Sequence, residues 1–335
     1  LLLHGYQESC QRHWKIEYFM IKDWFKLSEQ RRREIFIQTS QRTALPPWSV
    51  EKDWWASMAL KSLFELDFSE QLLFKGGTTL SKGWNLIQRF SEDIDVAINM
   101  NYLGYEGDPT LKKITKLRKA SYAFTRDTLC TALDAKLEDA GFGEYRIEPN
   151  EEPNTSTDPH SLNLHYHSLT QQSEYISPSV KIEVSARSLM EPIEKRGIQT
   201  FVGAIFPGQR FTDPSKLINT VVPKRTFLEK AFLLHEEFNR NSEEMRSERM
   251  SRHLYDLEKM MDIDHCSEAL KDKELYISII QHRATFTRLK DVGYKTHQPE
   301  HINFIPPEAI IKEYSRDYDR MQESMIFGVS LPLDV

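Results

Sequence analysis

The stretch from residue 72 to residue 98 constrains the fold more than any other part of this sequence. An apolar run at 72–74 leads into the glycine pair Gly76-Gly77, and residues 78–88 then follow a helical pattern. Residues 93–98 alternate between acidic and apolar side chains, which is typical of a half-buried strand. The order of strand, glycine turn, helix and strand at this compact spacing predicts two strands joined through a helix.

The glycine pair predicts an anion site. A strand that ends at Gly76 and Gly77 and opens a helix at Thr78 presents free backbone N–H groups beside a helix N-terminus, where a β-carbon would obstruct a ligand. Glycine before a helix is also common in plain turns. The pair is therefore a weak signal alone, and its meaning depends on the neighbouring residues.

Asp93 and Asp95 strengthen the interpretation as a site. They stand two apart on one strand and project from the same face, where two like charges are tolerable only with a cation between them. Mg²⁺ suits such a pair of carboxylates, so we expect it there. A solvent-facing acidic pair at a strand edge is the alternative, and the ordered elements before the pair argue against it.

Glu183 is the candidate for a third carboxylate. Nucleotidyl transfer requires a cradle for the triphosphate, cations and an activated hydroxyl, and two-metal sites usually use three carboxylates. Residues 180–187 alternate, so that Glu183 shares a strand face with Lys181 and Ser185, as in the lining of a cleft. An exposed amphipathic strand is the alternative. Glu183 could also act as the general base, or the reaction could need no protein base.

The remaining patterns predict two parts. Residues 1–19 differ in pattern from the rest of the chain, and we expect the native chain to begin at Met20. Residues 20–215 predict a core with N-terminal helices, and residues 216–335 a mainly helical C-terminal domain. Outside residues 72–98, helices are expected at 21–43, from about 49 to 63, and at 112–140, 226–240, 246–262 and 267–290, and strands at 162–168 and 180–187.

Charge and cysteine patterns limit the classes of protein. The 335 residues carry a formal net charge of −6, so any contact with nucleic acid must come from local patches. One helix offers such a patch, which either binds an RNA backbone or is only a solvated face: Lys112, Lys113, Lys116, Arg118 and Lys119. The cysteines are far apart, and no apolar run is long enough to span a bilayer. We expect a cytoplasmic protein.

Taken together, the motifs resemble those of one family. Segments 75–82 (KGGTTLSK) and 89–95 (RFSEDID) are similar to the AbiEii/AbiGii toxin family of nucleotidyltransferases, which are distant relatives of DNA polymerase beta. Further segments that resemble this family are 51–55, 181–188, 225–230 and 252–257. The resemblance covers about residues 20–290, and the combination of motifs is specific.

The resemblance implies an α+β fold, in which a nucleotidyltransferase mixed sheet with flanking helices precedes a helical C-terminal domain and the site lies between them. It assigns Asp93 and Asp95 to metal. It assigns the nucleotide to Gly76, Gly77, Thr78, Lys82 and Lys230.

A later helix with an Arg-x-x-x-Asp motif also matters in this family, and Arg252 with Asp256 fits it. The two lie four apart on one helical face, so they could orient each other at the nucleotide. The alternatives are a surface ion pair for Arg252 and Asp256, and an ordinary surface lysine for Lys230.

The implied function is transfer of a nucleotide from a nucleoside triphosphate (NTP) to a hydroxyl, with two Mg²⁺ ions. The expected acceptor is RNA, at the 3′ end of tRNA, and the family consists of toxins of toxin–antitoxin and phage abortive-infection systems, which implies an antitoxin protein as partner. A two-metal nuclease and a non-catalytic nucleotide- or RNA-binding module are the alternatives. The Gly-Gly-Thr segment argues against a nuclease, because a nuclease has no triphosphate to hold.

Overall fold

The computed structural model describes residues 21–106, 110–151, 154–171, 177–261, 263–289 and 292–333. The expected upstream extension 1–19 and the expected start at Met20 lie outside this range. No helix in the described part of the chain combines the length and the apolar character that crossing a membrane requires.

A seven-stranded mixed sheet, in the order β3-β4-β5-β2-β1-β7-β6, forms the centre of the molecule. Its strands are β1 (Leu72–Lys75), β2 (Ile94–Ile98), β3 (Tyr145–Pro149), β4 (His160–Tyr166), β5 (Ser179–Ser185), β6 (Ile193–Ile198) and β7 (Lys216–Val221). Strand β1 runs antiparallel to β2 and parallel to β7, and β2 runs parallel to β5. The predicted mixed sheet with flanking helices is therefore confirmed.

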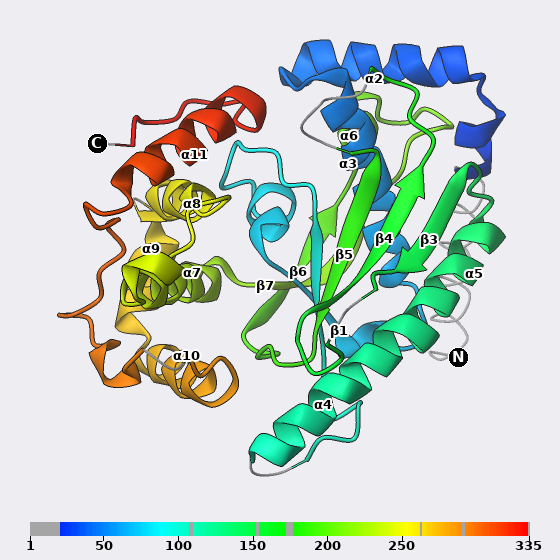
Figure 1. The fold of residues 1–335 in the computed structure, drawn as a ribbon. Coiled ribbons are helices and arrows are strands. Elements are labelled where there is room, and N and C mark those ends of the chain that lie inside the picture. Colours follow the sequence, from blue (N-terminus) through cyan, green and yellow to red (C-terminus); the bar gives the residue numbers. More distant parts are fainter. Residues whose placement is uncertain are drawn as a thin grey trace, which may run out of the picture.

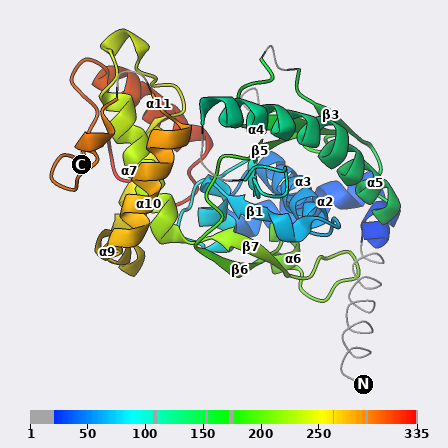
Figure 2. The same cartoon turned by 90° about the horizontal axis from the view of Figure 1, so that it is seen from below.

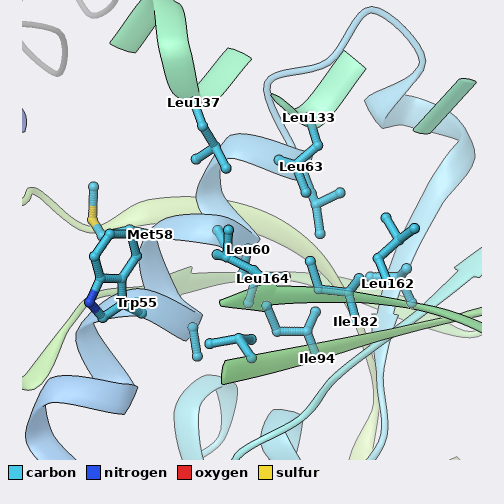
Figure 3. Close-up of a cluster of buried hydrophobic side chains, with 14 of the residues drawn as sticks. Trp55, Met58, Leu60, Leu63, Ile94, Leu133, Leu137, Leu162, Leu164 and Ile182 are labelled. Carbon is cyan, nitrogen blue, oxygen red and sulfur yellow. The ribbon is translucent and has the colours of Figure 1, made fainter. Parts of the chain in front are cut away.

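Helix α3 (Pro47–Leu63) lies against one face of this sheet and is buried along its length from residue 49 onwards. It is covered in turn by α5 (Cys130–Ala140), so that Leu60 and Leu63 lie between the leucines of α5 and the strand residues in Figure 3. The other helices of this part are α2 (Glu29–Thr43), α4 (Leu111–Ala123) and α6 (Phe201–Ile205). A π-helical segment (Phe124–Leu129) joins α4 to α5.

The C-terminal part forms a second group of helices on one side of the sheet (Figures 1 and 2). These helices are α7 (Pro223–Phe238), α8 (Ser251–Met261), α9 (Asp264–Lys271), α10 (Lys273–Phe286) and α11 (Ile311–Ser324). They have their own hydrophobic cluster, which also includes Leu80 and Ile87 from the sheet part. The predicted helical C-terminal part is present, and the boundary between residues 215 and 216 stays a prediction.

Three predicted helices differ in extent. The helix expected over 21–43 is interrupted at residues 27 and 28, where Ser28 caps α2. Instead of a helix over 78–88, only a π-helical turn (Thr79–Gly83) forms, because Gly83 ends it and Asn85 has a left-handed φ of 53°. The chain then crosses to the helical part, where the amide of Phe90 donates to the carbonyl of Met325 (2.6 Å). The predicted helix 267–290 is split into α9 and α10 at Asp272, whose side chain caps α10.

Candidate active site

A cavity of about 280 Å³ lies where the sheet meets the helical part. One wall comes from β1, β2, β5 and the segment after Gly76, and the other from α7, α8 and α10. The lining residues are Lys75, Gly76, Gly77, Arg89, Ser91, Asp93, Asp95, Glu183, Thr226, Glu229, Lys230, Leu233, Arg252, His253 and Arg283. The structure thus brings most of the predicted site residues to one place.

The sheet wall is acidic because strand register aligns its residues in a row. Asp95 pairs with Lys75 across β1 and β2, and with Glu183 across β2 and β5. Residues paired in register point to the same face of a sheet, so the three side chains are neighbours. A hydrogen bond joins the carboxyl groups of Asp95 and Glu183, and Asp93 lies at the same cavity, just before β2.

The acidic residues shift each other's ionisation. Burial raises the pKa of Asp95 to about 6, against the lowering effect of Lys75, and the negative charges of Glu183 and Asp93 add to the rise. Burial and the neighbouring Glu92 raise the pKa of Asp93. Burial acts to raise the pKa of Glu183, but the hydrogen bond and charge of Lys181, the hydrogen bond with Asp95 and the charge of Lys75 together lower it. The carboxylates of this wall therefore have more negative charge than their surroundings neutralise.

Glycine is required at positions 76 and 77 because the side chains of neighbouring residues lie close to the backbone there. The start of a long helix is not the reason. Gly76 has a left-handed φ of 82°, and a β-carbon there would lie 2.0 Å from Oδ2 of Asp95. A β-carbon on Gly77 would lie 2.5 Å from Nη2 of Arg89. Because the helix after this pair is only a short turn, the helix-dipole part of the predicted anion site is not present.

Thr78 positions the acidic pair instead of lining the cavity. Its hydroxyl donates to the backbone carbonyl of Asp93 (2.5 Å) and lies 2.8 Å from the hydroxyl of Ser91. It therefore ties the glycine turn to the residues that precede β2.

Lys82 lies away from the cavity. Its amine forms an ion pair with Asp53 of α3, donates to the backbone carbonyl of Gln199 (3.1 Å) and lies over the ring of Phe201 in α6. After the short turn the side chain points toward α3 and α6. The structure does not bring Lys82 to the other predicted nucleotide-binding residues.

The helical wall is basic, and Asp256 organises it. Its carboxylate accepts two hydrogen bonds from Arg89, at 2.7 and 2.8 Å, and lies 2.9 Å from the amine of Lys230. Although burial acts in the opposite direction, Arg89 and Lys230 hold the pKa of Asp256 well below its ordinary value. Asp256 is completely buried, so its role is to fix the two cations rather than to contact a substrate directly.

Arg252 differs from this pattern, and its predicted pairing with Asp256 is wrong. Asp256 is engaged by Arg89 and Lys230, while Arg252 points into the cavity. The Nε of Arg252 is buried and has no hydrogen-bond partner among the described residues. Burial, together with Arg89 and Arg249, lowers the pKa of Arg252. A half-buried guanidinium that forms no ion pair with a described carboxylate is suited to an anionic ligand.

Sequence reasoning missed several residues of the site, among them Arg89, Glu92 and Arg283. Arg89 was inside a quoted motif, and a cation four residues before an acidic pair was the available signal. Glu92 binds Lys52 of α3 (2.8 Å) and Arg249 of the helical part (2.6 Å), so it links both walls beside Asp93. Arg283 comes from α10, where no local signal marked it.

The carboxylates of the sheet wall fit a divalent metal by their chemistry. Asp93, Asp95 and Glu183 supply only oxygen donors, which Mg²⁺ prefers, and the shared hydrogen bond of two of them is where a cation would relieve repulsion. Among the described residues no three acidic, imidazole or thiol groups are already arranged as a metal site. Asp93 and Asp95 would hold a metal, with Glu183, which pairs with Lys181 in this structure, as the third carboxylate beside Asp95.

A mixed sheet with a glycine turn and an acidic pair on a central strand, facing a basic helical part, is typical of nucleotidyltransferases. The family described as "Nucleotidyl transferase AbiEii toxin, Type IV TA system" matches residues 59–334. The chain therefore belongs to the AbiEii family of nucleotidyltransferase toxins, which confirms the family predicted from the motifs.

Solved structures of two proteins are similar to this chain. MenT4, a nucleotidyltransferase toxin from Mycobacterium tuberculosis H37Rv, is 17% identical over 86% of this chain and 88% of its own, with a TM-score of 0.45. JHP933 from Helicobacter pylori is 14% identical over 83% of this chain and 97% of its own, with a TM-score of 0.36. No curated protein matches the sequence.

Proposed function

We propose that this chain transfers a nucleotide from an NTP to a hydroxyl at the 3′ end of a tRNA, in a Mg²⁺-dependent reaction in the cytoplasm. As the toxin of a two-gene system, it would stop growth unless a cognate antitoxin restrains it. One observation supports the proposal most directly: four carboxylates, three of them on the sheet wall, and five lysine and arginine side chains line the same cavity. A triphosphate with bound metal has the complementary charges.

The proposed roles depend on position. Asp93 and Asp95 hold metal, with Glu183 as the third carboxylate. The chemistry that two Mg²⁺ ions supply when bound is neutralisation of the triphosphate and a lower pKa for the attacking hydroxyl. Gly76 and Gly77 keep the approach to Asp95 and Arg89 free of side-chain atoms.

The basic wall would bind the phosphates. Lys230 and Arg252 line the cavity opposite the acidic row, and Arg283 extends the same wall. Asp256 and Arg89 would keep Lys230 in place, because both are buried and fixed by hydrogen bonds. Fixed cations need no reorganisation when charge develops on the transferred group.

The test is a transfer assay. The purified protein is incubated with Mg²⁺, total tRNA and each radiolabelled NTP in turn, beside an Asp93→Ala, Asp95→Ala variant. We expect label in the tRNA with the wild type alone. Shortened, unlabelled RNA would instead assign a nuclease, and unchanged RNA in all lanes would assign a non-catalytic binding module. In cells, expression of the wild type should slow growth, and equal toxicity of the variant would contradict the catalytic account.

A further inference from the structure

Helix α4 carries a stripe of positive charge that the active site does not use. Ile114, Leu117 and Ser121 are its buried side, and Lys112, Lys116 and Lys119 lie at helical spacing on its exposed side. Arg126 continues the row in the π-helical segment that follows α4, where it lies 3.7 Å from Asp127. Their spacing of four, three and seven residues matches one face of a helix. No ion pair joins the three lysines to a carboxylate among the residues that the structure describes.

Charge is segregated along the continuous rod that α4 and α5 form. Residues 111–126 contain six cations and no acidic residue, whereas residues 127–140 contain four acidic residues and Lys136. Lys136 is itself paired with Glu65 (2.8 Å). A merely solvated helix face usually mixes the two signs, because mixed charges are enough for solubility. In a chain of net charge −6, a helix free of acidic residues is a local feature that needs another reason.

The basic half of the rod is the half beside the active site. The guanidinium of Arg118, in the middle of α4, donates to the backbone carbonyl of Phe286 (3.4 Å), and Arg187 donates to the same oxygen (2.8 Å). Phe286 ends α10, the helix that contributes Arg283 to the cavity. Both Figure 1 and Figure 2 show the first turns of α4 on the side of α10, and the acidic α5 directed away from the helical part.

From these observations we infer that α4 is the surface on which a structured RNA docks through its phosphate backbone. Lys112, Lys116, Lys119 and Arg126 are the contact residues. The stripe is about 21 Å long at 1.5 Å per residue, and a duplex carries one phosphate per about 1.7 Å of axis, so it faces more phosphates than it has cations. Flexible lysines without carboxylate partners suit a regular polyanion, whereas a protein partner would present discrete charges and an apolar centre.

This inference rests on the proposed function in one respect: an RNA docked on α4 is expected to place its 3′ end at the cavity, which α10 lines. It does not need catalysis to be tested, because docking is measured as binding. The acidic α5 would repel the same RNA, which limits contact to the part of the rod beside the cavity.

The experiment measures binding of fluorescently labelled total tRNA by anisotropy, between 50 and 300 mM salt. A Lys112→Gln, Lys116→Gln, Lys119→Gln variant is compared with the wild type. The slope of log affinity against log salt concentration should become shallower by about 0.7 to 0.9 for each lost phosphate contact. For the triple variant we therefore expect a slope shallower by about two, and tRNA binding about tenfold weaker at 50 mM salt. Since all three lysines are exposed, the melting temperature should stay unchanged.

The matched control is Lys271→Gln, Lys295→Gln, Lys312→Gln, which removes the same charge from exposed positions of the helical part. Equally weakened tRNA binding in both variants would overturn the inference. Unchanged tRNA binding in the α4 variant would overturn it as well, and would instead favour an acidic protein surface as the partner of α4. Wild-type protein that does not bind tRNA would overturn it as well. Selective loss of binding in the α4 variant supports it even if no nucleotide is transferred, in which case the proposed function alone fails.

Discussion

The two walls of the cavity carry opposite charges, and they differ in how far the protein itself neutralises those charges. On the helical wall, Asp256 holds Lys230 together with Arg89 of the sheet part, and Glu236 holds Arg283. Arg252 forms no ion pair with a carboxylate among the described residues. On the sheet wall Asp93, Asp95 and Glu183 lie together, and burial raises the pKa of Asp93 and Asp95. The cations that act on them include Lys75, Lys181, Lys52 and Arg249. Apart from Arg252, the cations of the helical wall are thus neutralised from within the protein, whereas the sheet wall is suited to a cation from outside.

Replacing an aspartate by asparagine should therefore lower the stability of the protein on the helical wall and raise it on the sheet wall. The largest effect is expected for Asp256→Asn, which leaves two buried cations without their carboxylate. Removing one partner of a buried pair typically costs about 3–5 kcal/mol, so the free energy of unfolding should fall by this amount. Urea unfolding monitored by circular dichroism measures it. As a control, Glu313→Gln on the exposed side of α11 should change stability by less than about 0.5 kcal/mol. A loss as small as in the control would show that the helical wall is not held by Asp256.

The glycine turn offers a second test, since it touches both walls. Gly76→Ala combines a left-handed backbone with a clash against Asp95, and we expect it to lower stability by about 3 kcal/mol and to abolish transfer. Gly208→Ala is the matched control, because Gly208 has a similar φ of 79° but open space around its β-carbon. Backbone strain alone costs about 1 kcal/mol. Equal losses in the two variants would mean that the close approach of Asp95 is unimportant.

Asp95→Asn is expected to stabilise the protein by about 1 kcal/mol at pH 8 in the absence of divalent metal, because it removes one of the repelling charges. The raised pKa sets the sign: the carboxyl contributes stability that is complete below its unfolded-state pKa of 3.8 and is lost as the pH rises through about 6. The gain should therefore disappear at pH 4. Urea unfolding at both pH values measures this.

Transfer activity should respond in the opposite direction to stability at this position. If Asp95 holds metal, Asp95→Asn should lower kcat/KM by about 10³-fold, equivalent to about 4 kcal/mol. Addition of Mg²⁺ should stabilise the wild type and leave the variant unchanged. A destabilised Asp95→Asn protein at pH 8 would contradict the view that this wall carries uncompensated charge.

The two walls also differ in how far the sequence predicts them. Strand alternation places Asp93, Asp95 and Glu183 on polar faces, and the sheet then brings them together by register, so local patterns were sufficient. The contacts of Asp256 span 167 residues to Arg89, and no periodicity specifies which of several arginines it binds. Arg252 is closer in sequence and has the right helical spacing, which is why the wrong partner was predicted.

The missed elements have similar causes. Strand β6 (Ile193–Ile198) is largely polar and exposed at the sheet edge, so it lacks the alternation that marked β5. The helix predicted over 78–88 has a valid periodicity, but Trp84 donates to the backbone carbonyl of Val221 (3.0 Å) and residue 85 leaves the helical region. Tertiary contacts overrode local preference there, and as a result Lys82 points away from the cavity while Arg89 lines it.

Arg252 is the one cation of the helical wall that no carboxylate holds, and it gives the smallest expected change in stability. Arg252→Gln should alter the free energy of unfolding by less than about 0.5 kcal/mol, because Arg252 is only half-buried and forms no ion pair with a carboxylate among the described residues. Lys230→Gln, by contrast, removes one of the two partners of Asp256 and should be clearly destabilising. If Arg252 binds the triphosphate, its variant should raise the KM for the NTP by roughly ten- to a hundredfold, since a charged hydrogen bond contributes about 1.5–3 kcal/mol. Initial rates at varied NTP measure this. Equal destabilisation by the two variants would place Arg252 in the structural network, and the helical wall would then have no cation left for a ligand.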